Sequence, residues 1–282
     1  MPPAASHLRP HVSRDHAIRR WFCLDLDGTV LEYDCEPGRI HDEAIAFLNA
    51  LDLERFGWII NSGREVRDQL RILDLSVTRG LEVLPEALLC CEAEIYVREH
   101  QAYKPWDDWN ETVARAQASF NREVRLAMAE DIAVWGRELG AHRLYLDDRV
   151  TGVVLAGLSP EEAAAVVARF REALGPLGDR GTVTENALWV SAMPGGYHKG
   201  RLLEEWMVRH GVPPASVLAI GDDHNDLSML DGSVVPHVGC PADARPMVAE
   251  LVEAKGGRIA SRPGPPGTVE LMTLWMTLGE QA

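Results

Sequence analysis

Two carboxylates that flank a single residue constrain this chain more than any other feature. Asp25 and Asp27 lie at the end of the apolar segment Trp21–Leu26, and Gly28 follows them. Side chains alternate along a strand, and a turn beginning at Asp25 would aim both acids beyond the strand's carboxyl end. Open α/β sheets bind ligands at that edge. Like charges beside an apolar segment are costly, so the pair indicates a cation or a reaction that uses them.

The segments on either side of a central block alternate between strand and helix patterns. Strands separated by helices at this spacing predict a parallel sheet with crossover connections. The predicted strands are Trp21–Leu26, Gly57–Ile60, Ala87–Cys91 and Val217–Ile220, with weaker ones near Ser233–Val238 and Arg258–Ala260. The predicted helices are Ile40–Leu53, Glu65–Leu75, Lys199–Arg209 and, after a loop over 262–267, Val269–Leu278.

The central block follows a different pattern and begins at a junction rich in proline and aromatic residues. It contains a long helical stretch, two strand candidates, a helix and a closing hairpin, at 111–139, 143–146, 150–156, 160–174 and 182–190. These elements predict an inserted α+β domain. The expected fold class is therefore α/β, with a doubly wound, parallel-sheet Rossmann-like core over 1–104 and 191–282 and an inserted cap domain over 105–190.

Composition excludes several classes of protein. The 43 acidic and 28 basic residues of this 282-residue chain give a net charge of −15. A nucleic-acid partner needs a basic face, so none is expected. No apolar run has the length of a membrane span, and no membrane partner is expected. The five cysteines show no metal-ligand spacing, which favours reduced thiols in a cytoplasmic protein.

Four motifs fall at the ends of predicted strands or the start of a predicted helix. They are Asp25-x-Asp27-Gly28-Thr29, Asn61-Ser62-Gly63-Arg64, the segment Gly195–Gly200 around Lys199, and Gly221-Asp222-Asp223-His224-Asn225-Asp226. Phosphoryl transfer is the chemistry that they could share. An aspartate can serve as nucleophile, a second carboxyl group as general acid and base, and a hydroxyl and a lysine can stabilise the phosphoryl oxygens. A hard cation such as Mg²⁺ would offset the crowded negative charge.

Each motif also has a purely structural interpretation. Asp-x-Asp-Gly can be a simple turn, Ser62 a helix N-cap, Lys199 a solvated loop residue, and Gly221–Asp226 an acidic turn. Their occurrence together, in this order and at these places, favours the shared site over four independent turns.

With these motifs in place, the chain resembles the haloacid dehalogenase-like superfamily of aspartate-nucleophile phosphatases, in the branch with a large α/β cap. The resemblance implies that Asp25 is the nucleophile and a Mg²⁺ ligand, and that Asp27 is the general acid and base and binds the metal through its carbonyl. The other implied roles belong to residues of the later motifs. Ser62 with Gly63, Lys199 and Asn225 would bind phosphate. Asp222 would bind Mg²⁺, and Asp226 would belong to the metal site, where it steadies the metal shell or Lys199.

Parts of the chain are similar to the sucrose-phosphate-phosphatase and Cof-like group, notably Pro85–Tyr96 and Met193–Gly200. Glu92-Ala93 stands where that group has Gly-Thr. The departure argues against sucrose phosphate itself, and the expected substrate is a sugar phosphate or a similar small phosphomonoester. Arg64, Glu92 and His198 are the candidate substrate contacts.

Two other functions share parts of this pattern. A phosphohexose mutase could use the same core and cap, but it needs a second phosphate site, and the candidate arginines of the cap form no visible cluster. A receiver-like module could accept phosphate on Asp25 without turnover. Asp27 and the large cap argue against the module, because a signalling domain needs neither rapid dephosphorylation nor a substrate lid.

Overall fold

The computed structural model describes residues 19–31, 38–138, 144–146, 153–156, 158–175, 181–186 and 189–278. The chain divides into two compact units, one of Met1–Trp106 with Lys199–Ala282 and one of Asp107–His198. The boundaries expected from the sequence were 104/105 and 190/191. The second boundary differs because strand β9 (Trp189–Pro194) pairs along its length within the second unit's sheet.

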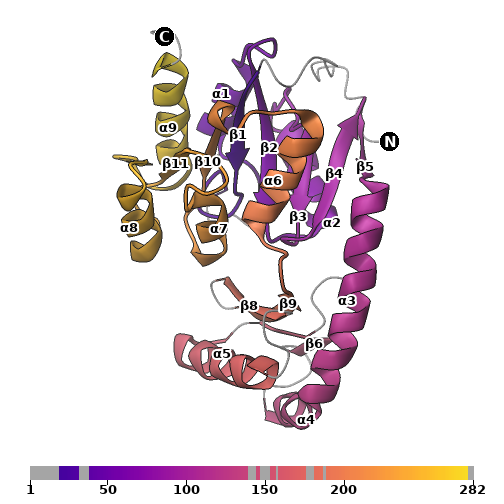
Figure 1. The fold of residues 1–282 in the computed structure, drawn as a ribbon. Coiled ribbons are helices and arrows are strands. Elements are labelled where there is room, and N and C mark those ends of the chain that lie inside the picture. The colour runs from indigo at the N-terminus through magenta and orange to yellow at the C-terminus, as the bar shows by residue number, and fades with distance from the viewer. Residues whose placement is uncertain are drawn as a thin grey trace. The chain divides into compact units, whose positions relative to one another are not determined.

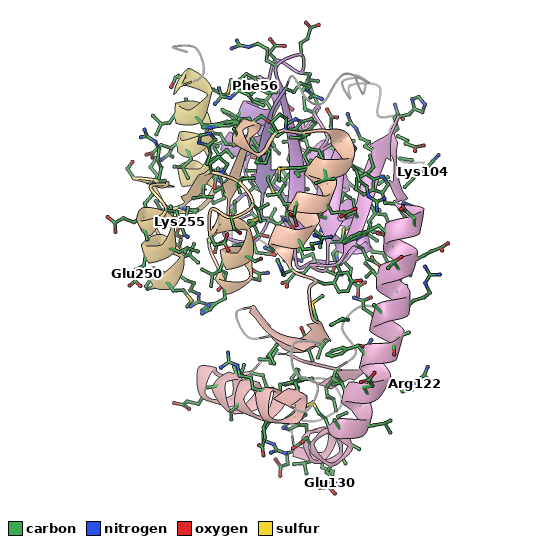
Figure 2. All side chains as sticks on the ribbon, in the orientation of Figure 1. Phe56, Lys104, Arg122, Glu130, Glu250 and Lys255 are labelled. Carbon is green, nitrogen blue, oxygen red and sulfur yellow. The ribbon has the colours of Figure 1, made fainter. Side chains whose placement is uncertain are left out.

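The core unit is built on an eight-stranded sheet of order β12-β11-β10-β1-β2-β3-β4-β5. The first six strands in this order run parallel, and β4 and β5 are antiparallel additions at one edge. The strands are β1 (Arg20–Leu24), β2 (Phe56–Ser62), β3 (Ala87–Cys90), β4 (Glu94–Glu99), β5 (Ala102–Pro105), β10 (Val217–Ile220), β11 (His237–Cys240) and β12 (Arg258–Ile259). Figure 2 labels Phe56, the residue that begins β2.

Helices cover both faces of this sheet, with α6 crossing in front of the strands in the view of Figure 1. Among these helices, α9 packs against α1, and α6 packs against α7. The helices are α1 (Asp42–Asn49), α2 (Val66–Val77), α6 (Lys199–His210), α7 (Leu227–Leu230), α8 (Pro246–Ala254) and α9 (Gly264–Leu278), with 3₁₀ turns at Pro214–Ser216 and His224–Asp226. The expected doubly wound α/β fold class is confirmed.

Apolar runs explain why the central strands form. Every residue of β2, β3 and β10 is buried, as is expected for parallel strands with helices on both faces. Aromatic packing continues into the helices, because the Trp21 and Trp206 rings meet edge to face with centroids 4.8 Å apart. This packing joins α6 to β1 and so supports the position of the first residue of α6, Lys199.

The order of the strands places a topological switch point between β1 and β10. The chain moves from β1 to β2 on one side of this pair and from β10 to β11 on the other, so the winding reverses there. Doubly wound sheets bind their ligands at such a switch point, beyond the carboxyl ends of the strands. Asp25 follows β1 directly and Asp222 lies two residues beyond β10, so both acids lie at this switch point.

The described residues of the second unit form an antiparallel sheet of order β6-β7-β9-β8 and three helices. The strands are β6 (Leu144–Leu146), β7 (Val153–Leu155), β8 (Gly181–Asn186) and β9; the helices are α3 (Asp107–Ala127), α4 (Ala129–Glu138) and α5 (Pro160–Leu174). A capping box of Ser159 and Glu162 begins α5. The unit's apolar core includes Trp135 and Phe170, whose rings stack with centroids 5.7 Å apart.

Truncation of Phe170 tests that core. The ring is fully buried, and Phe170→Ala is expected to lower the free energy of unfolding by about 3–5 kcal/mol through the lost contacts and the cavity. Leu126→Ala is the control, because Leu126 lies in the same unit with 75% of its surface exposed and is expected to change stability by less than about 0.5 kcal/mol. Urea unfolding followed by circular dichroism measures both. Equal stability of the two variants would contradict the packing described here.

Several elements differ from the sequence-based expectation. Strands β4 and β5 were not expected, and the predicted long helix is divided into α3 and α4 by a turn at Met128. The last helix begins at Gly264, inside the segment expected to be a loop. Prolines 265 and 266 are tolerated there because N–H groups in the first turn of a helix have no intrahelical partner.

The described residues also bear on the cysteines and on membrane insertion. Cys23, Cys90, Cys91 and Cys240 are buried free thiols, and Cys35 lies outside the described residues. None of the helices in the described part of the chain is long and apolar enough to cross a membrane.

Candidate active site

The four motifs converge at the carboxyl edge of the core sheet. Asp25 follows β1, Ser62 is the last residue of β2, and Asp222 follows β10. Lys199 begins α6, and the Asn61 side chain holds that helix start by donating to the Lys199 carbonyl at 2.9 Å. Residues far apart in the chain therefore meet in one unit, at the place where doubly wound sheets bind ligands.

Lys199 is the centre of this cluster. Its Nζ lies 2.7 Å from Oδ1 of Asp25 and 2.5 Å from Oδ1 of Asp226, and its side chain is fully buried. Burial disfavours the ammonium, but the charges and hydrogen bonds of Asp226 and Asp25 outweigh it, and the net effect raises the pKa of Lys199. The ammonium is therefore a permanent positive charge directed at the first acid of the Asp25/Asp27 pair.

Asp25 lies among more negative charge than Lys199 can offset. Burial raises the pKa of Asp25 well above its usual value, Lys199 opposes the rise, and the charges of Asp226, Asp222 and Asp27 add to it. A carboxylate in these surroundings becomes a stable anion when a further cation enters. The electrostatics of the cluster thus favour a metal ion beside Asp25.

The donor set fits a hard divalent cation. Carboxylate oxygens of Asp25, Asp222 and Asp226 lie within 4.8 Å of one another, and oxygen ligands are those that Mg²⁺ prefers. The Thr29 hydroxyl donates to Oδ1 of Asp222 at 3.0 Å and orients it. Asp25 and Asp222 are the side chains best suited to hold the ion directly.

Asp226 is better suited to hold its neighbours than to bind the metal. One of its oxygens accepts from Lys199, and the other accepts from the backbone N–H groups of Asp222 and Asp223 at 2.9 and 3.0 Å. Gly221 makes this possible, because a Cβ there would lie 2.3 Å from Cγ of Asp226. Of the two expectations for Asp226, the structure favours the one in which it steadies Lys199.

Asp27 is paired with Arg64 by two hydrogen bonds. Nε of Arg64 donates to Oδ2 at 2.7 Å and an Nη donates to Oδ1 at 2.6 Å. The bond to Asp27 raises the pKa of Arg64, so the guanidinium remains charged. Arg64 therefore fixes the orientation of the second acid, and it does so from the second motif.

The other expected phosphate and substrate residues occupy different environments. Ser62 is buried, and its hydroxyl accepts from the backbone N–H of Arg64 at 3.3 Å, while Gly63 lies between them. Asn225 donates from Nδ2 to Oε1 of the buried Glu92 at 3.1 Å. His198 is the last residue of the second unit, whereas the other site residues belong to the core unit.

Sequence reasoning missed two residues that support the site. Thr29 was quoted only as part of the first motif, although its buried hydroxyl orients Asp222. Asn61 preceded Ser62 without a role, although it holds the start of α6. A polar residue at the last inward-facing position of a buried strand was the available signal for Asn61.

Comparison with known proteins agrees with this fold. Residues 140–236 match the family model of the haloacid dehalogenase-like hydrolases. Over this segment the chain is similar to that family, and the solved structures described below share its fold. The resemblance expected from the four motifs is confirmed. No curated protein matches the chain significantly.

Solved structures with this fold cover nearly the whole chain. The sucrose-phosphatase from Synechocystis sp. PCC6803, solved in complex with sucrose and phosphate, has 17% identity and a TM-score of 0.66, with 92% of this chain and 97% of that chain covered. A phosphatase of the superfamily from Bacteroides thetaiotaomicron has 17% identity, a TM-score of 0.62 and coverage of 99% and 97%. A haloacid dehalogenase-like hydrolase from B. subtilis has 16% identity, a TM-score of 0.60 and coverage of 90% and 99%.

Proposed function

We propose that this hydrolase is a Mg²⁺-dependent phosphatase that cleaves a small phosphomonoester through a phospho-Asp25 intermediate. The contact of the buried Lys199 ammonium with Asp25, at 2.7 Å, is the observation that carries the proposal. A lysine buried only for stability would leave the acid neutralised and inert. Here burial raises the pKa of Asp25, Lys199 lowers it, and the charges of three further carboxylates raise it again. This excess of negative charge suits a site for a cation and a phosphoryl group.

The reaction takes two steps at phosphorus. A carboxylate oxygen of Asp25 attacks the phosphorus atom and the bond to the leaving oxygen breaks. Asp27 enters this step protonated and donates its proton to that oxygen. Asp27 then removes a proton from water, whose oxygen attacks the same phosphorus atom and breaks its bond to Asp25. Inorganic phosphate leaves, the Asp25 carboxylate is regenerated, and Asp27 is protonated again for the next turnover.

The surrounding residues supply charge and orientation. Lys199 and the Ser62 hydroxyl offset and bind the phosphoryl oxygens, and Arg64 holds Asp27 between its proton transfers. Asp25 and Asp222, with the Asp27 carbonyl, would hold Mg²⁺. When bound, the ion supplies positive charge for the attacking acid and the phosphoryl group.

The substrate class is proposed from chemistry and from analogy. A sugar phosphate or a comparable small phosphorylated metabolite is the partner that we propose, in line with the sucrose and phosphate held by the Synechocystis enzyme. We propose that the second unit acts as a cap that excludes water and selects the leaving group. The free, buried thiols suit a reducing compartment, and we propose the cytoplasm.

Removal of Mg²⁺ tests the metal requirement. EDTA is expected to lower the rate of p-nitrophenyl phosphate hydrolysis by at least about 100-fold, because the acids around Asp25 then lack their main counter-charge. Added MgCl₂ is expected to restore the rate, whereas CaCl₂ is not, since Ca²⁺ prefers more ligands and longer bonds. EDTA saturated with Mg²⁺ beforehand is the control. Full activity in excess EDTA would refute the metal requirement.

A screen of sugar phosphates with Mg²⁺ identifies the substrate and separates the proposal from its alternatives. Release of inorganic phosphate is expected. Formation of an isomeric sugar phosphate without phosphate release would instead indicate a mutase.

A further inference from the structure

The connection between β3 and β4 is a strained tight turn. The Ala93 N–H donates to the Cys90 carbonyl at 3.0 Å and closes the turn, whose central residues are Cys91 (φ 52°) and Glu92 (φ 58°). Positive φ at both central positions is the pattern of a type I′ turn, which favours Asn-Gly because glycine and asparagine adopt positive φ with less strain than other residues. This chain instead places a cysteine and a glutamate in the turn.

Glu92 is also unfavourable for its charge. Its residue is only 6% exposed, and burial raises the pKa of the carboxyl, while the charge of Lys199 and the hydrogen bond from Asn225 oppose that rise. Glycine would relieve both the backbone strain and the buried charge. Strain and burial that persist together in one residue point to a use for its side chain.

The partner of Glu92 indicates that use. Oε1 of Glu92 accepts from Nδ2 of Asn225 at 3.1 Å, and Asn225 lies in the 3₁₀ turn that follows β10. A carboxylate only accepts hydrogen bonds, so the amide must face it with its NH₂ group, and this fixes the rotation of the amide. The turn itself is anchored to the segment that follows β2, since the Cys91 N–H donates to the Arg64 carbonyl at 3.2 Å.

We propose that Glu92 is a positioning residue that orients the Asn225 amide toward the phosphoryl group. This inference rests on the proposed phosphatase function, in which Asn225 binds phosphate. The two residues are 133 positions apart in the chain, and the hydrogen bond joins the turn after β3 to the acidic loop after β10. Glu92 thus sets one phosphate donor while Asp226 sets another, Lys199.

Three variants test the positioning role with p-nitrophenyl phosphate and Mg²⁺. Glu92→Gly removes the acceptor and is expected to lower kcat/KM by about 10–100-fold, mainly through a higher KM, with a matching rise in the inhibition constant of inorganic phosphate. Glu92→Gln keeps an oxygen that accepts from Asn225 and is expected to restore kcat/KM to within about threefold of the wild type. Cys91→Gly is the control, because it relieves the same backbone strain without touching the carboxylate.

The outcomes separate positioning from stability. Both glycine variants are expected to raise Tm by about 2–4 °C, so an activity loss confined to Glu92→Gly cannot come from unfolding. Wild-type kcat/KM and phosphate inhibition in Glu92→Gly would overturn the proposal, as would equal losses in Glu92→Gln and Glu92→Gly. The proposed function fails separately, if the wild-type chain hydrolyses no phosphomonoester with Mg²⁺ present.

Discussion

Replacing Asp25 with asparagine is expected to abolish phosphate release, with a fall in kcat on the order of 10⁴-fold or more. The amide oxygen is a poor nucleophile for phosphorus, so no phospho-enzyme forms. The fold is expected to survive, because an asparagine oxygen can still accept from Lys199. The change also removes one of several crowded buried charges, so Tm is expected to be unchanged or higher.

The measurement is phosphate release by purified Asp25→Asn, with mass spectrometry to establish that the asparagine has not reverted to aspartate by deamidation. Asp74→Asn is the matched control, since it makes the same chemical change at an exposed position of α2. The control is expected to retain activity within about twofold, as is usual for surface substitutions. A wild-type rate in Asp25→Asn would disprove the nucleophile assignment.

Replacing Lys199 with methionine is expected to produce the largest loss of stability at this site. Asp25 and Asp226 would remain buried without their cation, which costs about 3–5 kcal/mol for a broken buried ion pair. Phosphatase activity is expected to fall as well, by about 100-fold or more, since a charge directed at the phosphoryl group is lost. Urea unfolding in EDTA measures the stability, because added Mg²⁺ would mask part of the charge imbalance.

Lys104→Met provides the comparison for the effect of burial. Lys104 pairs with Glu99 at 2.6 Å, nearly the Lys199–Asp25 distance, but both side chains are more than half exposed (Figure 2 labels Lys104). Solvent screens such a pair, and its loss is expected to leave the stability almost unchanged. Equal losses in the two variants would show that Lys199 does not compensate buried charge.

The Lys199 effect has a predictable pH dependence. In the wild type, burial lowers the pKa of Lys199, but Asp226 and Asp25 raise it by more, so the pKa in the folded state lies above that of an unfolded lysine. The ammonium therefore stabilises the fold fully at any pH below the unfolded pKa, and this stabilisation is lost only in strong alkali. In Lys199→Met the Asp25 carboxyl loses the cation that opposes the rise of its pKa, so its protonation at lower pH stabilises the fold more. The stability gap between wild type and variant is therefore expected to narrow as the pH falls from 8 to 5.

The sequence by itself determined the layout of the core and the edge that carries the site. Asp25, Ser62 and Asp222 each lie at or just beyond the end of a buried strand. Because parallel strands end at the same edge of a sheet, the sequence places all three residues at that edge. Strands β4 and β5 could not be predicted from the sequence pattern. The turn between β3 and β4 has Cys91-Glu92 at the positions where asparagine or glycine would indicate a hairpin.

Only the tertiary structure decided how the side chains pair within that edge. Arg64 holds Asp27 across 37 positions, and Asn225 meets Glu92 across 133. Asp226 accepts hydrogen bonds from Lys199 and from the backbone of its own loop. Local patterns set which residues reach the edge, because strand period and turn chemistry act over a few positions. Which side chains pair depends on differences of a few tenths of an ångström in the distances between residues that are remote in the chain. The packing of the whole fold sets those distances.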